Sequence, residues 1–187
     1  MGINLQKGQK IDLTKGNPQL SKIMVGLGWD MSEARGSHSI DCDASVIMLN
    51  NNNKMTEMVY FANKKSKNNA VIHSGDNLTG AGAGDDETIV IEIPKITPET
   101  EKMIFVVNIY DCERRKQDFG MIKNAYIRII DGNGNSEFAK FNLSDNYAGK
   151  TALVAGEIYR YNGEWKFNPV GEGTTHKSLS EMTAQYK

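Results

Sequence analysis

Short runs of β-branched and aromatic residues, separated by Gly, Asn and Asp, recur along almost the whole chain. Such runs are typical of strands, and Asn, Asp and Gly accept the left-handed backbone angles of tight turns. Hairpin turns are therefore expected at residues 50–54, 131–135 and 162–163. Many short strands with little helix predict a mainly β fold, an antiparallel β-sandwich.

The expected strands are residues 3–7, 23–29, 41–49, 58–61, 88–93, 103–110, 125–130, 138–143, 151–161 and 165–170. Helix is expected at two places only. Pro98 favours one helical turn at residues 97–102, and residues 176–185 form a short C-terminal helix with Leu179 and Met182 on one face. The longest stretch without strand character is residues 62–86, and a loop of that length is usually functional or disordered.

Length and charge limit the classes of function. A chain of 187 residues is expected to form a single domain, residues 1–187, with a real core. Its 22 basic and 23 acidic residues nearly balance, which gives no electrostatic footprint for nucleic acid or for a charged membrane surface. The apolar runs are too short to span a bilayer, so no direct membrane insertion is expected.

Localisation and redox state follow from the N-terminus and the cysteines. The segment MGINLQKGQKIDL has no apolar signal region, which favours a cytoplasmic protein. Cys42 and Cys112 belong to no metal-binding pattern. We expect both thiols to stay reduced in a cytoplasm.

The segment GDNLTGAGAGDDE, residues 75–87, concentrates four carboxylates and four glycines and contains no Lys or Arg. Like charges this close repel one another unless a cation lies among them. Calcium binds six to eight oxygens from carboxylates, backbone carbonyls and Asn side chains, and glycine lets a backbone turn its carbonyls inward. The alternative interpretation is a solvated acidic loop. The carboxylates are Asp76, Asp85, Asp86 and Glu87.

A second acidic element favours the metal interpretation. Asp41 and Asp43 flank Cys42 at the start of an expected strand, so that both carboxylates point to one face, about 7 Å apart. Alone, this pair also fits a solvated strand start. Three further carboxylates lie at or within strand runs, where sites and turns are both common: Asp30, Asp111 and Glu157.

Other kinds of site have weaker support. The glycine segment lacks the Gly-Lys-Ser/Thr ending of a phosphate-binding loop, and its carboxylates would repel phosphate. The segment DGNGNSE from Asp131 resembles an EF-hand loop but departs from it at Ser136 and Asn142, which favours a hairpin turn. No histidine lies in a nucleophile motif. We expect His73 to be a surface residue rather than a partner of the acidic site.

The chain resembles the tellurium-resistance TerD family of bacterial stress-response proteins. The resemblance covers almost the whole chain, in the family's order and spacing. It is carried by VGLGWD (25–30), DCDASV (41–46), HSGDNLTGAGAGDDE (73–87), IYDCERRKQDFG (109–120) and GEIYRYNGEWKF (156–167). It implies a cytoplasmic, calcium-binding β-sandwich linked to tellurite and chemical-stress resistance, with no enzymatic activity firmly attached to it. It also implies other tellurium-resistance proteins as partners, some of them membrane-associated.

The resemblance implies a set of calcium ligands as well, from the acidic strand and the glycine-acid segment. Asp30, Asp111 and Glu157 stand in matching motifs and form a weaker part of the set. Cys42 replaces a residue that is often Leu in the family and leaves the carboxylate pattern intact. The implied ligands are Asp41, Asp43, Asp76, Asn77, Asp85, Asp86 and Glu87, with backbone oxygens from residues 80–84, including Gly80 and Gly82.

The sequence therefore predicts a non-enzymatic calcium-binding protein of the stress response, without a catalytic residue. Two neighbouring Ca²⁺ ions are expected, because one calcium rarely needs more than three or four carboxylates. Relief of charge crowding suggests that Asp85→Asn would not destabilise the metal-free protein. Two alternatives stay open: a metal-dependent enzyme acting on phosphate-containing, nucleotide-like substrates, and a calcium-gated interaction module.

Overall fold

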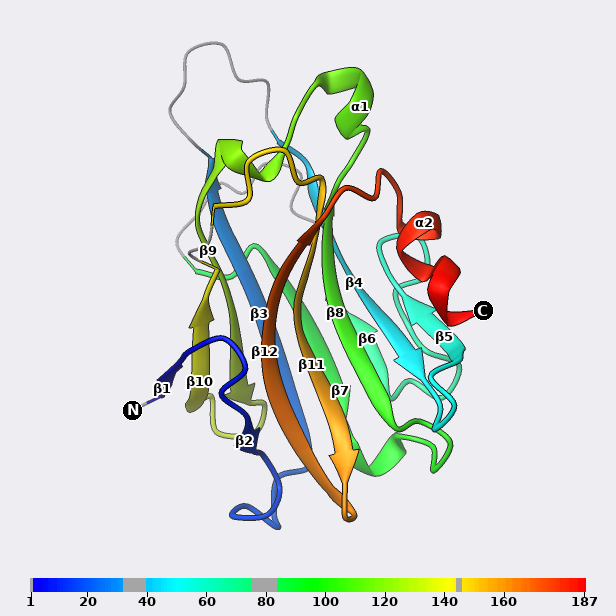
Figure 1. The fold of residues 1–187 in the computed structure, drawn as a ribbon. Coiled ribbons are helices and arrows are strands. Elements are labelled where there is room, and N and C mark those ends of the chain that lie inside the picture. Colours follow the sequence, from blue (N-terminus) through cyan, green and yellow to red (C-terminus); the bar gives the residue numbers. More distant parts are fainter. Residues whose placement is uncertain (1, 32–39, 75–83, 144–145) are drawn as a thin grey trace.

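The protein is a sandwich of two six-stranded sheets in a computed structural model that describes residues 2–31, 40–74, 84–143 and 146–187 (Figure 1). Sheet A contains, in spatial order, β1 (Ile3–Leu5), β10 (Glu137–Asn142), β9 (Ile122–Asp131), β3 (Lys22–Met31), β7 (Glu87–Glu92) and β6 (Val71–His73). Sheet B contains β2 (Ile11–Asp12), β12 (Glu164–Thr174), β11 (Ala152–Tyr161), β8 (Lys102–Ile109), β4 (Cys42–Leu49) and β5 (Met55–Val59). This arrangement confirms the predicted β-sandwich.

Almost all strand pairs are antiparallel, and β1 pairs with β10 in parallel. The three predicted hairpin turns are present, between β4 and β5, β9 and β10, and β11 and β12. Their left-handed residues are Asn and Gly, as the sequence predicted. They include Asn53 (φ 55°), Asn135 (φ 55°), Asn162 (φ 52°) and Gly163 (φ 80°).

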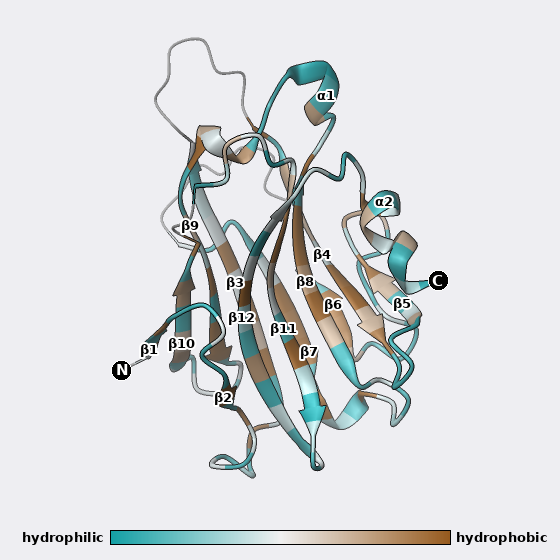
Figure 2. Ribbon diagram, in the orientation of Figure 1, coloured by the Kyte–Doolittle hydropathy of each residue, from teal (hydrophilic) through white to brown (hydrophobic). Residues whose placement is uncertain are grey.

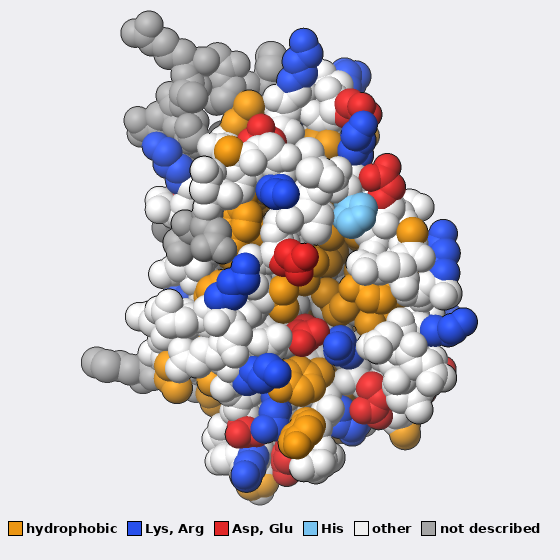
Figure 3. Space-filling view, in the orientation of Figure 1, with side chains coloured by type: hydrophobic (Ala, Val, Ile, Leu, Met, Phe, Trp, Pro, Cys, Tyr) orange, Lys and Arg blue, Asp and Glu red, His pale blue; other side chains and the backbone are white. Residues whose placement is uncertain are grey.

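Alternating side chains build one core between the sheets and a smaller cluster outside sheet B. In β4, Cys42, Ala44, Val46 and Met48 face the inner core. Ile47 and Leu49 face outward, where they pack with Met182 of α2 (Leu179–Thr183). Figure 2 shows the hydrophobic residues concentrated along the strands, and Figure 3 shows hydrophobic side chains gathered in the middle of the sheet B face.

Helix is scarce, as predicted, but its positions differ in part. The C-terminal helix is present and consists of α2 followed by a 3-10 turn, η3 (Ala184–Tyr186). The helical turn expected at residues 97–102 is wrong: Pro98 lies in a tight turn closed by Thr100 N–H and Thr97 O, and β8 begins at Lys102. The sequence did not predict η1 (Ile93–Lys95), α1 (Cys112–Arg115) and η2 (Phe119–Met121).

Two short strands were also missed. β2 and β6 contain two and three residues and lie at edges of their sheets, where alternation over so few positions is no signal. β6 lies inside the stretch 62–86 that the sequence presents as strand-free. None of the helices in the described part of the chain is long and apolar enough to cross a membrane.

Candidate metal centre

Four of the predicted acidic residues lie at one end of the sandwich. There β3 and β8 end, while β4 and β7 begin, and Figure 1 shows α1 above the same end. The segment before β7 brings Asp86 and Glu87 to this end, and the start of β4 brings Asp41 and Asp43. Two segments more than forty residues apart in the sequence therefore meet here, as predicted.

Asp86 and Glu87 are fixed by backbone groups of neighbouring strands. Asp86 N–H donates to Leu27 O at 2.8 Å, and Trp29 N–H donates to Asp86 Oδ2 at 2.7 Å. Glu87 is 2% exposed and accepts a hydrogen bond of 2.7 Å from Ala44 N–H of β4. A strand of sheet A thus reaches the edge of sheet B through the Glu87 carboxylate.

His73 is a partner of this site, and the expectation of a surface histidine is wrong. The side chain is 3% exposed, and Nε2 lies 3.3 Å from Glu87 Oε2 and 3.2 Å from Ala44 O. The cause is β6, which pairs His73 with Ile89 and turns its ring toward the interior. Without β6, the sequence gives no reason to bury this residue.

Asp43 lies on the outer face of sheet B, opposite in direction to the core residues Cys42 and Ala44. It is only 6% exposed. Asp41 precedes the strand, and its Oδ2 lies 3.9 Å from Arg115 Nη1. The prediction that Cys42 and Asp43 point to opposite faces of the strand is confirmed.

The buried Cys42 thiol lies in the field of several of the predicted acidic residues. Burial is the main cause that raises the pKa of this thiol well above its ordinary value. The negative charges of Asp43, Glu87, Asp41 and Asp86 raise it further, in that order. The charges of four predicted ligands therefore act on one buried side chain. Every one of them is an oxygen donor.

Asp85 has different surroundings. Its carboxylate accepts from Arg128 Nε at 2.7 Å and Nη2 at 3.0 Å, and the Tyr126 hydroxyl lies 3.0 Å from Oδ1. It lies over Gly26, where a Cβ atom would overlap it. The ion pair keeps the pKa of Arg128 raised, mainly through its hydrogen bond to Asp85. The Arg128 guanidinium thus pairs with a carboxylate that the sequence predicted as a metal ligand.

The three weaker candidates each have partners of their own. Asp30 is exposed and accepts a hydrogen bond of 2.8 Å from Asn124 Nδ2. Asp111 precedes α1 in a left-handed conformation (φ 52°) and forms an ion pair with Arg114. Glu157 lies in β11, bound to Asn168 Nδ2 at 3.0 Å and to Lys102 Nζ at 3.3 Å. The structure does not bring these three into the cluster around Cys42.

Asp76, Asn77, Gly80 and Gly82 lie outside the described residues. Within residues 2–31, 40–74, 84–143 and 146–187, no three His, Cys, Asp or Glu side chains are grouped closely enough to hold a metal ion. Only part of the predicted ligand set lies among the described residues. That part is a gathering of carboxylates, not a closed cage.

Sequence reasoning missed two buried polar residues beside Asp43. Asn108 of β8 lies directly opposite Asp43 and is 8% exposed, and Ser45 is 1% exposed. Among the residues described, neither Asn108 Oδ1 nor Ser45 Oγ has a hydrogen-bond partner. The available signal was a single polar residue inside the run FVVNIY, but its significance depends on the β4–β8 register.

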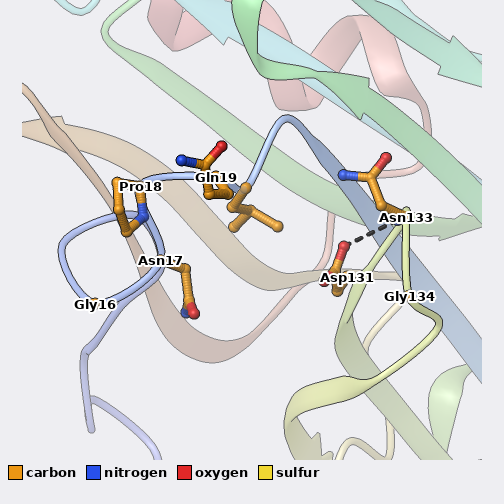
Figure 4. Close-up of a pocket in the computed structure, with 8 residues that line it drawn as sticks. Gly16, Asn17, Pro18, Gln19, Asp131, Asn133 and Gly134 are labelled. Carbon is orange, nitrogen blue, oxygen red and sulfur yellow. Dashed lines mark hydrogen bonds between the residues drawn. The ribbon is translucent and has the colours of Figure 1, made fainter.

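The EF-hand-like segment is a hairpin turn, as predicted. Asn133 N–H donates to Asp131 Oδ1 at 2.9 Å, and Asn135 N–H donates to Asp131 O at 2.8 Å. This turn and residues 16–20 line a pocket of about 560 Å³ at the opposite end of the sandwich (Figure 4). Asp131 is therefore remote from the acidic end.

Comparison with known proteins identifies the family. The family model of the TerD domain matches residues 1–186. The chain belongs to the TerD family. Among TerD-family relatives, it is 53% identical to the stress response protein SCP2 of Bacillus subtilis, with all of both chains covered. It is 39% identical to the tellurium resistance protein TerD of Serratia marcescens, over 100% of this chain and 97% of that protein.

A solved structure supports the fold. A homologue of the telluride resistance protein from Streptomyces coelicolor A3(2) superimposes with a TM-score of 0.71 at 21% identity. The match covers 90% of this TerD-family chain and 98% of the other. The two chains share the sandwich architecture.

Proposed function

We propose that this TerD-family protein is a cytoplasmic, non-enzymatic calcium-binding protein of the stress response, associated with tellurium resistance. The observation that carries the proposal is that Asp41 and Asp43, at the start of β4, lie at the same end of the sandwich as Asp86 and Glu87, with Glu87 bound to Ala44 N–H. They come from two segments of the chain and converge at one end of the fold. Such convergence is the usual way in which a β-sandwich presents a site on its loops.

Burial of these carboxylates requires compensation. Asp43 is 6% exposed and Glu87 is 2% exposed, and a buried charge is costly unless it is paired. Basic side chains beside them in the described part of the chain include His73, which is charged only when protonated, and Arg115, 3.9 Å from Asp41. A divalent cation would add positive charge that several of these carboxylates share.

The donor set fits calcium. All four side chains offer hard oxygen ligands, and the neighbouring segment 75–83 adds Asp76, Asn77 and a run of glycines in the sequence. Calcium accepts six to eight oxygens in flexible geometry, whereas zinc prefers nitrogen and sulfur. We propose two ions, since the carboxylates outnumber those that a single calcium uses. When bound, calcium would neutralise this end of the sandwich and fix its backbone.

A metal-dependent enzyme acting on phosphate-containing substrates is the alternative function. Such an enzyme needs an open cleft beside its metal. Two open pockets formed by described residues, of about 560 and 390 Å³, lie at the opposite end and include Asp131 in the first and Trp165 in the second. A small cavity near the acidic end is lined by apolar side chains such as Trp29 and Phe119.

The protein's two thiols fit the proposed cytoplasmic location. Cys42 and Cys112 are both free and buried, which suits a reducing compartment. In this proposal, calcium orders the acidic end for contact with other tellurium-resistance proteins, including membrane-associated ones. Binding of such a partner in calcium and its loss in chelator would support the interaction role. Calcium-independent binding would contradict it.

Calorimetric titration of metal-stripped protein tests the proposal. Wild type, Asp43→Asn and Asp131→Asn are titrated with calcium. We expect Asp43→Asn to weaken binding tenfold or more, since about 1.4 kcal/mol already gives a factor of ten. Asp131→Asn is the matched control, because it removes the same charge at the opposite end of the sandwich. Calcium binding that survives Asp43→Asn but not Asp131→Asn would move the site to the hairpin turn.

A further inference from the structure

Asn108 is buried beside an acidic residue and has an unused oxygen. In the antiparallel β4–β8 pair, Asn108 lies directly opposite Asp43, so both side chains leave the same, outer face of sheet B. Directly opposed residues have Cβ atoms about 4.5–5.5 Å apart. Asn108 is 8% exposed, and no described residue donates a hydrogen bond to its Oδ1.

A buried amide oxygen without a partner is unfavourable. It has lost the hydrogen bonds of the hydrated group, and most buried polar atoms in proteins are hydrogen-bonded. A second oxygen of this kind lies close by. Ser45 is two residues beyond Asp43 on the same face of β4, is 1% exposed, and has no hydrogen-bond partner for its Oγ in the described ranges. Two unused oxygens thus adjoin one buried carboxylate.

The outer face of sheet B changes character at this point. Farther along the same strands it is apolar, formed by Ile47, Leu49, Ile104 and Val106 beneath α2. An apolar residue at position 108 would continue that surface. A polar amide there, with its oxygen buried, is explained if that oxygen binds a cation.

We propose that the side-chain carbonyl of Asn108 is an uncharged oxygen ligand of the cation that Asp41 and Asp43 hold. The proposal rests on the calcium-binding function argued above and adds a residue that the sequence motifs do not indicate. Calcium accepts Asn carbonyl oxygens together with carboxylates. A neutral donor beside Asp43 adds coordination without adding repulsion between like charges.

A hydrogen bond is the competing explanation. If the amide were rotated by half a turn, its Nδ2 would face Asp43, and Asn108 would then be a structural partner of that carboxylate. Amide orientation is assigned from hydrogen-bonding surroundings. The two explanations are therefore distinguished by how variants of Asn108 bind calcium and melt, rather than by distances.

The experiment compares Asn108→Leu, Asn108→Asp and Asn168→Leu with wild type, by calorimetric calcium titration and by thermal melting in chelator. Asn108→Leu removes the oxygen and keeps the size. Asn108→Asp keeps the oxygen and adds charge. Asn168→Leu is the matched control: its Oδ1 also lacks a described partner and it lies in the same sheet, but it bonds to Glu157 through Nδ2.

We expect Asn108→Leu to weaken calcium binding at least tenfold while its metal-free melting temperature is not lowered. Asn108→Asp should bind calcium at least as well as wild type and melt earlier in chelator, because like charges directly opposite each other repel. Asn168→Leu should bind as wild type does. If Asn108→Leu does not fold, the affinity of Asn108→Asp decides: an affinity below that of wild type overturns the proposal.

Two outcomes for Asn108→Leu would overturn the inference while calcium binding itself stands. One is wild-type affinity. The other is a lower metal-free melting temperature together with weaker binding, as expected for a lost hydrogen bond to Asp43. Failure of the wild type and of Asn168→Leu to bind calcium would instead overturn the proposed function, and the inference with it.

Discussion

Arg128 holds both carboxylate oxygens of Asp85, with Nε 2.7 Å from Oδ1 and Nη2 3.0 Å from Oδ2. The Tyr126 hydroxyl also lies 2.7 Å from Gly84 O, so two side chains of β9 fix the backbone just before Asp86 and Glu87. Asp85 therefore acts as an anchor that positions its two neighbours. Charge crowding alone suggests that Asp85→Asn would not destabilise the metal-free protein. The anchoring role predicts instead that this substitution lowers its stability.

The ion pair predicts coupled losses of stability. Asp85→Asn and Arg128→Gln should each lower the free energy of unfolding of the metal-free protein by about 1–3 kcal/mol, the usual range for charge-assisted hydrogen bonds. The double variant should lose little more than either single variant, because both remove one interaction. Urea unfolding of the four proteins in chelator gives the coupling energy. Additive losses would show that the two residues act independently.

Gly26 is predicted to be required for the same contact. A Cβ atom at this position would overlap the Asp85 carboxylate, although the strand conformation itself accepts alanine. Gly26→Ala should therefore destabilise the wild type and cost much less in an Asp85→Ala background, where the space is empty. Melting curves of the two pairs test this. Equal costs in both backgrounds would place the strain elsewhere.

Calcium should raise thermal stability. A ligand at about 100 times its dissociation constant that binds only the folded state adds roughly 2.7 kcal/mol per site. For a domain of this size, each 1 kcal/mol raises the melting temperature by roughly 2–4 °C. Differential scanning calorimetry in chelator and in millimolar calcium measures the shift. An unchanged melting temperature would count against a calcium site.

Calcium should also be preferred over magnesium, by at least an order of magnitude. Magnesium demands a smaller, nearly octahedral shell and releases its water reluctantly, whereas calcium accepts a larger and less regular set of oxygens. Titration with calcium in excess magnesium gives the ratio of affinities. Equal affinities would favour the alternative of a magnesium-dependent enzyme acting on phosphate compounds.

The Cys42 thiol should resist alkylation in the folded protein. Alkylation requires the thiolate, and burial together with the four nearby carboxylates raises the pKa of this thiol. At pH 8–9 an exposed thiol is partly ionised, but Cys42 keeps its proton. Iodoacetamide labelling followed by mass spectrometry should modify Cys42 in urea and leave it unmodified in buffer. Rapid labelling in buffer would contradict this.

The same pKa shift has a consequence for stability. Below the ordinary thiol pKa, near 8.5, the folded and unfolded states both hold the proton, and Cys42 adds no pH dependence. Above it, the unfolded chain releases the proton and the folded chain does not. The contribution of Cys42 to the free energy of unfolding therefore falls as the pH rises through the alkaline range.

Local patterns were enough to predict the sandwich. The longer strands alternate over six or more residues, as in β7, and Asn162-Gly163 specifies a hairpin by its backbone angles alone. β6 has three residues, so its alternation is not distinguishable from chance. The burial of His73 follows from that strand and was missed with it.

The site was predictable in its location but not in its internal pairing. Sequence places Asp85, Asp86 and Glu87 together, yet it does not show that Asp85 turns to Arg128 while Glu87 turns to Ala44. Those partners are 43 residues away in each case, and their choice depends on strand register and on the space left by Gly26. The importance of Asn108 likewise appears only when β8 is aligned with β4.

The N-terminal segment joins both sheets at one edge of the sandwich. β1 pairs with β10 through Ile3 and Ala139, and β2 pairs with β12 through Ile11 and Phe167. During synthesis, the first strands therefore leave the ribosome more than 130 residues before their partners exist. They must wait as unpaired, partly apolar chain, and contacts of such sequence separation form slowly. Until residue 167 has emerged, both strands lack their partners, and unpaired strand edges of this kind are prone to aggregation.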